Sequence, residues 1–201
     1  TEIALAANAH VNHIRIQRES AQAYHLANCS VVLAHASRYR SISLSLGSQI
    51  SRYNLDIRLA EEAAECTVDG LTLISNRQLA DTHTCIDHVK PNGTSHQQHK
   101  CIVDGAAHAV FNGKIIVRPH SQRTNSSQSS RNLLLSKTAQ IDTKPQLEIF
   151  ADDVKCAHGA TVGQLDPEEI FYLKSRGLSE VIARKLLTYA FGAEIISRIS
   201  I

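Results

Sequence analysis

Residues 148–166, EIFADDVKCAHGATVGQLD, place a thiol and an imidazole two residues apart, at Cys156 and His158. Two carboxylates, Asp152 and Asp153, precede them. In an extended segment alternate residues share a face, so Cys156 and His158 are expected to point the same way. A thiolate beside a neutral imidazole suits iron, zinc or an iron–sulfur cluster. A C-x-H pair also occurs in surface turns without chemistry, so these residues alone leave both interpretations open.

A second concentration of potential ligands lies between residues 83 and 101. Its six members are His83, Cys85, His88, His96, His99 and Cys101. In a strand, His83 and Cys85 face one way and His88 faces the other, and a Pro-Asn-Gly turn follows at once. The spacing matches neither a C-x-x-C pair nor H-E-x-x-H. We therefore interpret these residues as structural rather than as a zinc site.

Catalytic motifs give little support for an enzyme. The chain contains no G-x-S-x-G elbow, no G-x-x-x-x-G-K-[ST] phosphate loop and no dinucleotide-binding fingerprint. His158 could lower the pKa of the Cys156 thiol and make it a nucleophile. Two positions along one strand is a poor geometry for that pairing, and no third orienting group is evident. A stand-alone zinc or thiol hydrolase on an all-β scaffold is the alternative function that this pair leaves open.

Composition narrows the class of protein. At 201 residues the chain is long enough for one sizeable core, and 43% of its residues are hydrophobic but only 4% are aromatic. The net charge is +2, and no basic run is longer than two residues. This pattern predicts no nucleic-acid interface, which needs clustered Lys and Arg. No apolar run approaches the ~20 residues of a membrane span.

The cysteines do not form a disulfide framework. They are odd in number, widely spaced and without a C-x-x-C pair, at Cys29, Cys66, Cys85, Cys101 and Cys156. A reducing compartment is expected, with most of these thiols acting as small buried hydrophobes.

Residues 1 to about 150 read as short strands. Apolar and polar residues alternate, and turn residues interrupt every eight to twelve positions, as in 41–47, 53–59, 71–74 and 111–118. The alternation allows a sandwich, a barrel or a parallel β-helix, with the sandwich and the β-helix nearly equal. The polar stretch 121–132, SQRTNSSQSSRN, reads either as a linker or as an ordered coil. We favour the coil because apolar strands flank it closely.

Two helices are predicted after the strands. Asp166 is an N-cap with Pro167 at the first helical position and Glu169 in a capping-box arrangement. Gly177 ends this helix, and Ser179 caps a second helix over roughly 180–198.

The second helix has two apolar ridges. The broader stripe consists of Ile182, Leu186, Tyr189, Ala190, Ala193 and Ile196. The other ridge, at i, i+4 and i+8, consists of Leu187, Phe191 and Ile195. Either both ridges are buried within the chain or one of them receives a partner.

The run from Ile149 to Leu178, IFADDVKCAHGATVGQLDPEEIFYLKSRGL, resembles the C-terminal signature of the SufD family, subunits of the SufBCD iron–sulfur cluster assembly scaffold. Residues 13–20, 74–88, 108–118 and 131–150 are similar to that family's pattern in the same order. The family implies an all-β core, a right-handed parallel β-helix, followed by a small helical region. It predicts a core domain over 1–165 and a helical region over 166–201.

Members of that family are longer and begin with a helical N-terminal region that has no counterpart here. Because the chain also lacks methionine, we interpret it as a C-terminal core fragment. Cys85 falls where the family usually has an aliphatic residue, which predicts a core position for this thiol.

The resemblance also implies a role for each candidate residue. His158 matches the family's histidine at the interface with SufB, where it would be a metal ligand, and Cys156 matches a neighbouring cysteine. The cofactor is a transient iron–sulfur cluster shared with SufB, and none is expected in the isolated chain. A SufC-type ABC ATPase is expected to dock on the helical region, at Leu187, Phe191 and Ile195. The chain itself is then a non-enzymatic scaffold, with the ATPase activity in SufC.

Two expectations concern assembly and location. The isolated chain is expected to form a two-fold homodimer near residues 130–160 that mimics the SufB–SufD pairing, because open strand edges pair readily. The compartment is expected to be the cytoplasm, or the plastid stroma in a plastid-bearing organism.

Overall fold

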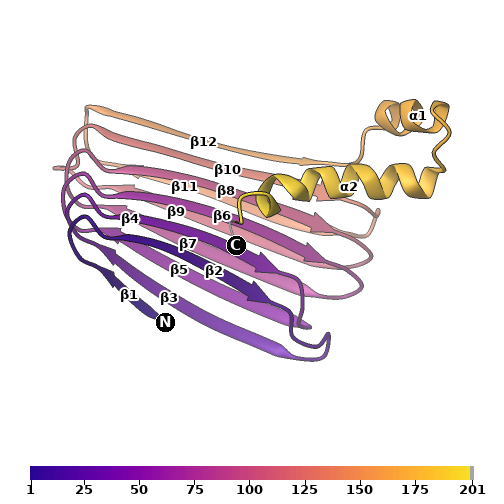
Figure 1. The fold of residues 1–201 in the computed structure, drawn as a ribbon, viewed down its shortest axis with the longest axis horizontal. Helices are drawn as coiled ribbons and strands as arrows, with labels where there is room; N and C mark the ends of the chain where they lie inside the picture. Colours follow the sequence, from indigo (N-terminus) through magenta and orange to yellow (C-terminus); the bar gives the residue numbers. More distant parts are fainter. Residues whose placement is uncertain (200–201) are drawn as a thin grey trace.

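The computed structural model describes residues 1–199, which form a parallel β-solenoid of about six turns followed by two helices (Figure 1). Odd-numbered strands build one six-stranded parallel sheet, sheet A, and even-numbered strands build the other, sheet B. The predicted parallel β-helix with C-terminal helices is confirmed. Within the described residues no helix is long and apolar enough to cross a membrane. The strands are β1 (Glu2–Leu5), β2 (His10–Gln17), β3 (Tyr24–Leu33), β4 (Arg38–Ser45), β5 (Ile50–Leu59), β6 (Glu65–Ile74), β7 (Leu79–His88), β8 (Thr94–Val103), β9 (His108–Val117), β10 (Thr124–Leu134), β11 (Gln140–Ile149) and β12 (Val154–Gly163).

The coils differ in length. Tyr24 pairs with Ile50, a step of 26 residues, whereas His108 pairs with Gln140, a step of 32 residues. The strands themselves keep nearly constant length, so the corners absorb the difference. This variation explains why the sequence shows no strict repeat.

The corners between the sheets stack on one another. One residue in each of four successive corners has a left-handed backbone, at Ala36, Ala63, Asn92 and Arg123. Each donates its N–H to a carbonyl in the next corner, with N···O distances from 2.6 to 3.2 Å. Corner stacking therefore keeps the strands in register even where coil lengths differ.

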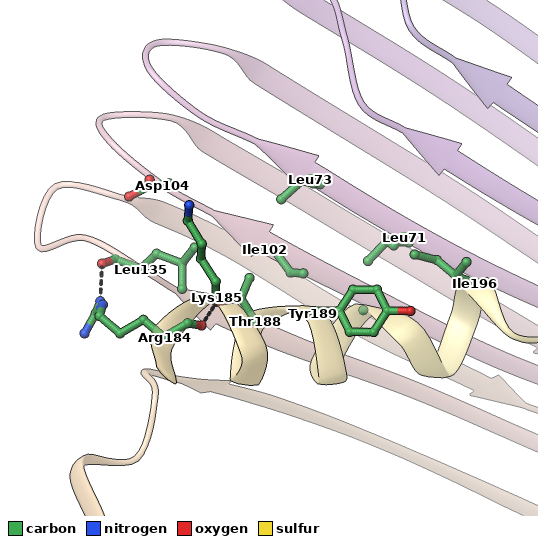
Figure 2. Close-up of a pocket in the computed structure, with 11 residues that line it drawn as sticks. Leu71, Leu73, Ile102, Asp104, Leu135, Arg184, Lys185, Thr188, Tyr189 and Ile196 are labelled. Atoms are coloured by element: carbon green, nitrogen blue, oxygen red, sulfur yellow. Dashed lines mark hydrogen bonds between the residues drawn. The ribbon is translucent and has the colours of Figure 1, made fainter. Parts of the chain in front are cut away.

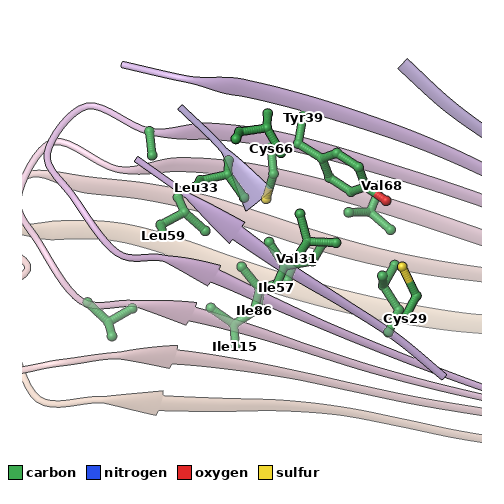
Figure 3. Packing of buried hydrophobic residues seen from close by; sticks show 14 of the residues in the cluster. Cys29, Val31, Leu33, Tyr39, Ile57, Leu59, Cys66, Val68, Ile86 and Ile115 are labelled. Atoms are coloured by element: carbon green, nitrogen blue, oxygen red, sulfur yellow. The ribbon is translucent and has the colours of Figure 1, made fainter. Parts of the chain in front are cut away.

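An apolar core runs along the inside of the solenoid from Leu5 of β1 to Ile115 and Val117 of β9 (Figure 3). Leu55, Ile57 and Leu59 of β5 are buried, whereas Asp56 and Arg58 between them are exposed. The inside of the cluster also holds Cys29 and Cys66, and Cys101 lies in a second cluster. Three of the five thiols thus act as small buried hydrophobes, as predicted, while Cys85 and Cys156 are only half-buried.

Toward the C-terminal end the inner face of sheet B becomes polar, while β9 of sheet A keeps Phe111, Ile115 and Val117 buried inside. Strand β10 turns five uncharged polar side chains inward, all buried, at Thr124, Ser126, Gln128, Ser130 and Asn132. They bond to one another and to neighbouring coils, and the Ser126 and Ser95 hydroxyls lie 2.6 Å apart. The ordered-coil interpretation of 121–132 is therefore confirmed, since these side chains replace apolar packing by mutual hydrogen bonds.

The helices are α1 (Pro167–Ser175) and α2 (Glu180–Ile196). Asp166 accepts a hydrogen bond from the Glu168 N–H, and Ser179 accepts one from the Ile182 N–H, so both predicted N-caps are present. Gly177 has a positive φ of 91°, as the predicted helix terminator requires. Helix α2 ends two residues earlier than predicted, and residues 200 and 201 of the predicted helical region lie outside the described residues.

Candidate functional site

Strand β12 carries Cys156 and His158 at the C-terminal end of the solenoid. It is the outermost strand of sheet B in the described chain, and its register pairs Ser126 with Cys156 and Gln128 with His158. Because Ser126 and Gln128 point into the solenoid, the two candidate ligands share the inward face of their strand. The structure therefore places them on one face, as their spacing predicts.

The two side chains differ in exposure. Cys156 is half-buried beside the apolar core, and this burial raises the pKa of its thiol, opposed by a hydrogen bond from the Ser126 backbone. The thiol is thus protonated at neutral pH and must release its proton to bind a metal as thiolate. His158 is exposed to solvent. The pair consequently offers a latent thiolate and an accessible imidazole at the open end.

Asp152 and Asp153 do not join this pair. Both are exposed in the corner between β11 and β12, where Asp153 accepts the Arg123 N–H through its backbone carbonyl. Among residues 1–199, no three or more His, Cys, Asp or Glu side chains are grouped so that they could hold a metal ion. The site as this chain builds it thus has two ligands and an open side.

The potential ligands between residues 83 and 101 are dispersed. His83 and Cys85 lie on the outer face of sheet A and His96 on that of sheet B, whereas His88, His99 and Cys101 are buried inside. The predicted core position of Cys85 is wrong, because its side chain points outward among Asp56, Asp87 and Lys114. Burial and these carboxylates raise the pKa of this thiol.

The ridge predicted to receive an ATPase faces the chain's own sheet B. Ile195 is fully buried and packs with Leu71 and Ile102, and Phe191 is half-buried against the same cluster. Leu187 is also half-buried and lines a shallow groove beside β12. This position corrects the expectation that all three side chains are free for a partner: Ile195 is core, and a role for Leu187 and Phe191 in partner binding stays a prediction.

The exposed apolar side chains of α2 belong instead to the broader stripe. Ile182, Leu186 and Tyr189 are 52%, 46% and 67% exposed. Helix α1 adds Phe171 and Tyr172, both exposed, and buries none of its residues. Both helices therefore expose large apolar side chains within the described chain.

A groove of about 490 Å³ runs between α2 and the outer face of sheet B (Figure 2). Its floor is apolar, formed by Leu71, Leu73 and Ile102 from the strands. Arg184 lies at one end and donates to the Leu135 carbonyl at 3.2 Å. The groove thus adds apolar side chains of sheet B to those that α2 exposes beside it.

A network of charged side chains holds the C-terminal end of α2 against sheet B. The sequence pattern does not predict it. Lys100 is 2% exposed, and its ammonium donates to the Phe191 carbonyl at 2.9 Å and pairs with Glu194. Arg198 pairs with the buried Asp69 at 2.6 Å. These partners are about 90 or more residues apart in sequence, so no local spacing could have indicated them.

The chain is similar to known proteins over almost its whole length. Residues 1–191 match the family described as SUF system FeS cluster assembly, SufBD core domain. The chain is 48% identical over 199 residues to an iron–sulfur cluster assembly SufBD family protein of Synechocystis, an alignment that covers 99% of this chain and 44% of the relative.

Two further relatives come from other lineages. The chain is 42% identical over 193 residues to the iron–sulfur cluster assembly protein SufD of Escherichia coli, covering 96% of this chain and 46% of that protein. It is 34% identical over 198 residues to the chloroplastic protein ABCI7 of Arabidopsis thaliana, covering 98% and 42%. The chain thus spans less than half the length of each of these three relatives.

Proposed function

The chain belongs to the SufBD family of the SUF system for iron–sulfur cluster assembly, and we propose that it works as a SufD-type scaffold subunit without catalytic activity of its own. Its cargo is the nascent cluster. The zinc or thiol hydrolase alternative is not favoured by the relatives, which are cluster-assembly proteins by name.

One observation carries this proposal: Cys156 and His158 share the inward face of the last strand at the open end of the solenoid. A cluster usually needs four protein ligands, and this pair supplies two. The missing ligands come from a second subunit seated on that end. His158 is the metal ligand and Cys156 the supporting thiol at this shared site.

A SufB-type paralogue is the proposed second subunit. Strands β11 and β12, ten residues each, have one hydrogen-bonded neighbour apiece in the described chain, so both sheets end in a free edge on the same side. Free edges pair readily with strands of another chain. A solenoid of the same design can continue both sheets and bring its own ligands to Cys156 and His158.

The proposed docking site for a SufC-type ATPase is the helical pair. Exposed apolar side chains on both helices, among them Phe171, Ile182 and Tyr189, form a surface of the kind that marks a protein–protein interface. Leu187 and Phe191 line a separate groove beside β12, and we propose that the ATPase also contacts them there. Bacterial and chloroplastic relatives fit a cytoplasmic or plastid stromal location for such a complex.

Two measurements test the scaffold assignment. Co-expressed SufB- and SufC-type subunits should co-purify with the chain, and the chain alone should carry no stoichiometric metal. Stoichiometric zinc in the purified chain would favour the hydrolase alternative instead.

His158→Ala tests the site itself. The exposed imidazole makes little contribution to the core, so folding and partner assembly should be unchanged while cluster formation on the reconstituted complex falls sharply. Cys156→Ser should have a milder effect. His96→Ala, an exposed histidine on the outer face of the same sheet, is the matched control and should assemble clusters normally. Wild-type cluster assembly by His158→Ala would overturn the site assignment.

A further inference from the structure

One inward-facing column of sheet B runs through the solenoid to the proposed cluster site. The parallel register aligns Gln97 of β8, Gln128 of β10 and His158 of β12. Gln97 and Gln128 are buried, and His158 is exposed. Adjacent strands are about 4.8 Å apart, so the Gln128 side chain is the nearest inner neighbour of the imidazole in this column.

The amide of Gln128 is held in one orientation. Its Nε2 donates to Gln97 Oε1 at 2.8 Å, and Gln97 Nε2 donates to Thr84 Oγ1 at 2.8 Å. The side chain reaches across the interior to Gly113 of β9, where a Cβ atom would lie 2.3 Å from Nε2. The absence of a side chain at Gly113 thus makes room for this amide.

The oxygen of the same amide has no partner. Gln128 Oε1 is buried and accepts no hydrogen bond from any described residue. The other inward hydroxyls of β10 near the site are occupied, because Ser126 pairs with Ser95 at 2.6 Å and Ser130 with Asn132 at 3.0 Å. Unpaired buried acceptors are uncommon in folded proteins, so this oxygen calls for an explanation.

A metal-bound histidine uses both ring nitrogens. One binds the metal, and the other donates its N–H to an oxygen that fixes the tautomer and the orientation of the ring. An uncharged, buried and rigidly held amide oxygen one strand away from His158 is such an acceptor. For this contact the His158 ring must turn inward from its exposed position, toward the register partner Gln128.

We propose that Gln128 is a positioning residue for His158: its Oε1 accepts the ring N–H and leaves the other ring nitrogen free to bind iron of the nascent cluster. This inference rests on the proposed function, in which His158 is a cluster ligand. Gln128 itself touches neither iron nor sulfide. Gln97 of the same column, held in turn by Thr84 of β7 on the opposite sheet, fixes the other end of this amide.

The test compares Gln128→Leu, which removes the acceptor at similar volume, with Ser130→Ala, which alters a neighbouring buried position on the same strand. The tautomer of His158 is read by NMR of the chain with ¹⁵N-labelled histidines, alone and with its SufB-type partner. The His158 signal is assigned by its loss in His158→Ala. The wild type and Ser130→Ala should show one dominant hydrogen-bonded tautomer, and Gln128→Leu a mixture of both.

Cluster formation provides a second reading. Loss of an oxygen that orients a ligating histidine typically lowers metal affinity or activity about 10- to 100-fold, and Gln128→Leu should fall in that range. Gln128→Glu, which keeps an acceptor oxygen, should recover most of the loss. If Gln128→Leu does not fold, Gln128→Asn withdraws the oxygen by one methylene and should give the same tautomer mixture.

The outcomes separate the two proposals. An unchanged His158 tautomer in both Gln128→Leu and Gln128→Asn overturns the positioning role, even if His158→Ala still blocks cluster formation. Wild-type cluster formation by His158→Ala overturns the proposed function instead, whatever the NMR signal shows.

Discussion

Two imidazoles lie inside the solenoid without access to water. Burial lowers the pKa of His88 and of His99 to about 4 each. His88 bonds to the Ser95 hydroxyl at 2.8 Å, and His99 stacks on Phe111 with ring centroids 4.4 Å apart. Both rings are therefore neutral at pH 7 and belong to the structure rather than to metal chemistry.

These histidines should make stability depend on pH. In the unfolded chain they bind protons near pH 6.5, whereas in the folded chain they resist protonation down to about pH 4. The stability that the neutral rings allow is complete above pH 6.5 and falls as the pH drops toward 4, by roughly 3 kcal/mol per ring. Denaturant unfolding at pH 7.5 and pH 5 should show the decrease.

His99→Gln is the control for that measurement. Near pH 5 it should lower the difference in bound protons between the unfolded and the folded chain by about one, because it removes one of the two buried rings. The slope of the unfolding free energy against pH should fall accordingly. A free energy of unfolding that is equal at the two pH values would contradict the burial argument.

Single positions also show how far the sequence can be read. Alternation is enough to place Cys156 and His158 on one face, since that needs only the strand period. It cannot say which face is inside, because this interior accepts Thr82, Thr84 and His88 as readily as apolar residues. The family's aliphatic residue at this position predicts a core site for Cys85, whereas in this chain Cys85 alternates with those buried side chains and points outward.

At the scale of elements, helix α2 shows the same limit. Both of its ridges are apolar, so the helix alone does not reveal which one docks. The choice depends on the outer face of sheet B, where Ile42, Leu44, Leu71 and Ile102 form an apolar patch beside Lys100. The strands that build this patch are far from α2 in the sequence, whereas the N-cap Ser179 is a local signal and was predicted correctly.

Charging each ridge separately should distinguish core from interface. Ile195→Glu places a carboxylate in a fully buried site and should lower the free energy of unfolding by more than about 3 kcal/mol. Leu186→Glu, on the exposed ridge, should change it by less than about 0.5 kcal/mol. Thermal unfolding of the isolated chain measures both.

The same variants bear on the ATPase. Leu186→Glu should weaken binding of a SufC-type subunit in a pull-down while the chain stays folded, because the proposed docking surface includes that side chain. Equal stability of Ile195→Glu and Leu186→Glu would contradict the described packing of α2.

At the scale of the whole molecule, the sequence pattern predicts the strands of the solenoid but not how they are arranged. Short alternating strands fit a sandwich as well as a β-helix, and coils of 26 to 32 residues hide the repeat. Nothing in the alternation distinguishes a neighbour in the same coil from one in the next. The resemblance to a family, rather than periodicity, selected the β-helix.

The isolated chain should form a two-fold dimer through its C-terminal end. In the described chain, strands β11 and β12 present free edges there. When no SufB-type subunit is present, these edges can pair with the same edges of a second copy of the chain. Light scattering over a range of concentrations should show the mass of a dimer, and Leu26→Lys, on the far end of the solenoid, should leave it unchanged. A monomer at high concentration would count against this pairing.

The weak burial of the last coil affects how the chain opens. Coils of a solenoid stabilise only their neighbours, so unfolding starts where a neighbour is missing and burial is least hydrophobic. That place is the coil of β11 and β12, whose strand residues are all exposed or half-buried, whereas Val31 and Ile57 of earlier coils are fully buried. Amide hydrogens of β12 should exchange with solvent first, and partner binding should slow them most. Cys156 and His158 would then acquire a fixed geometry only once the subunits meet, which confines cluster building to the assembled complex.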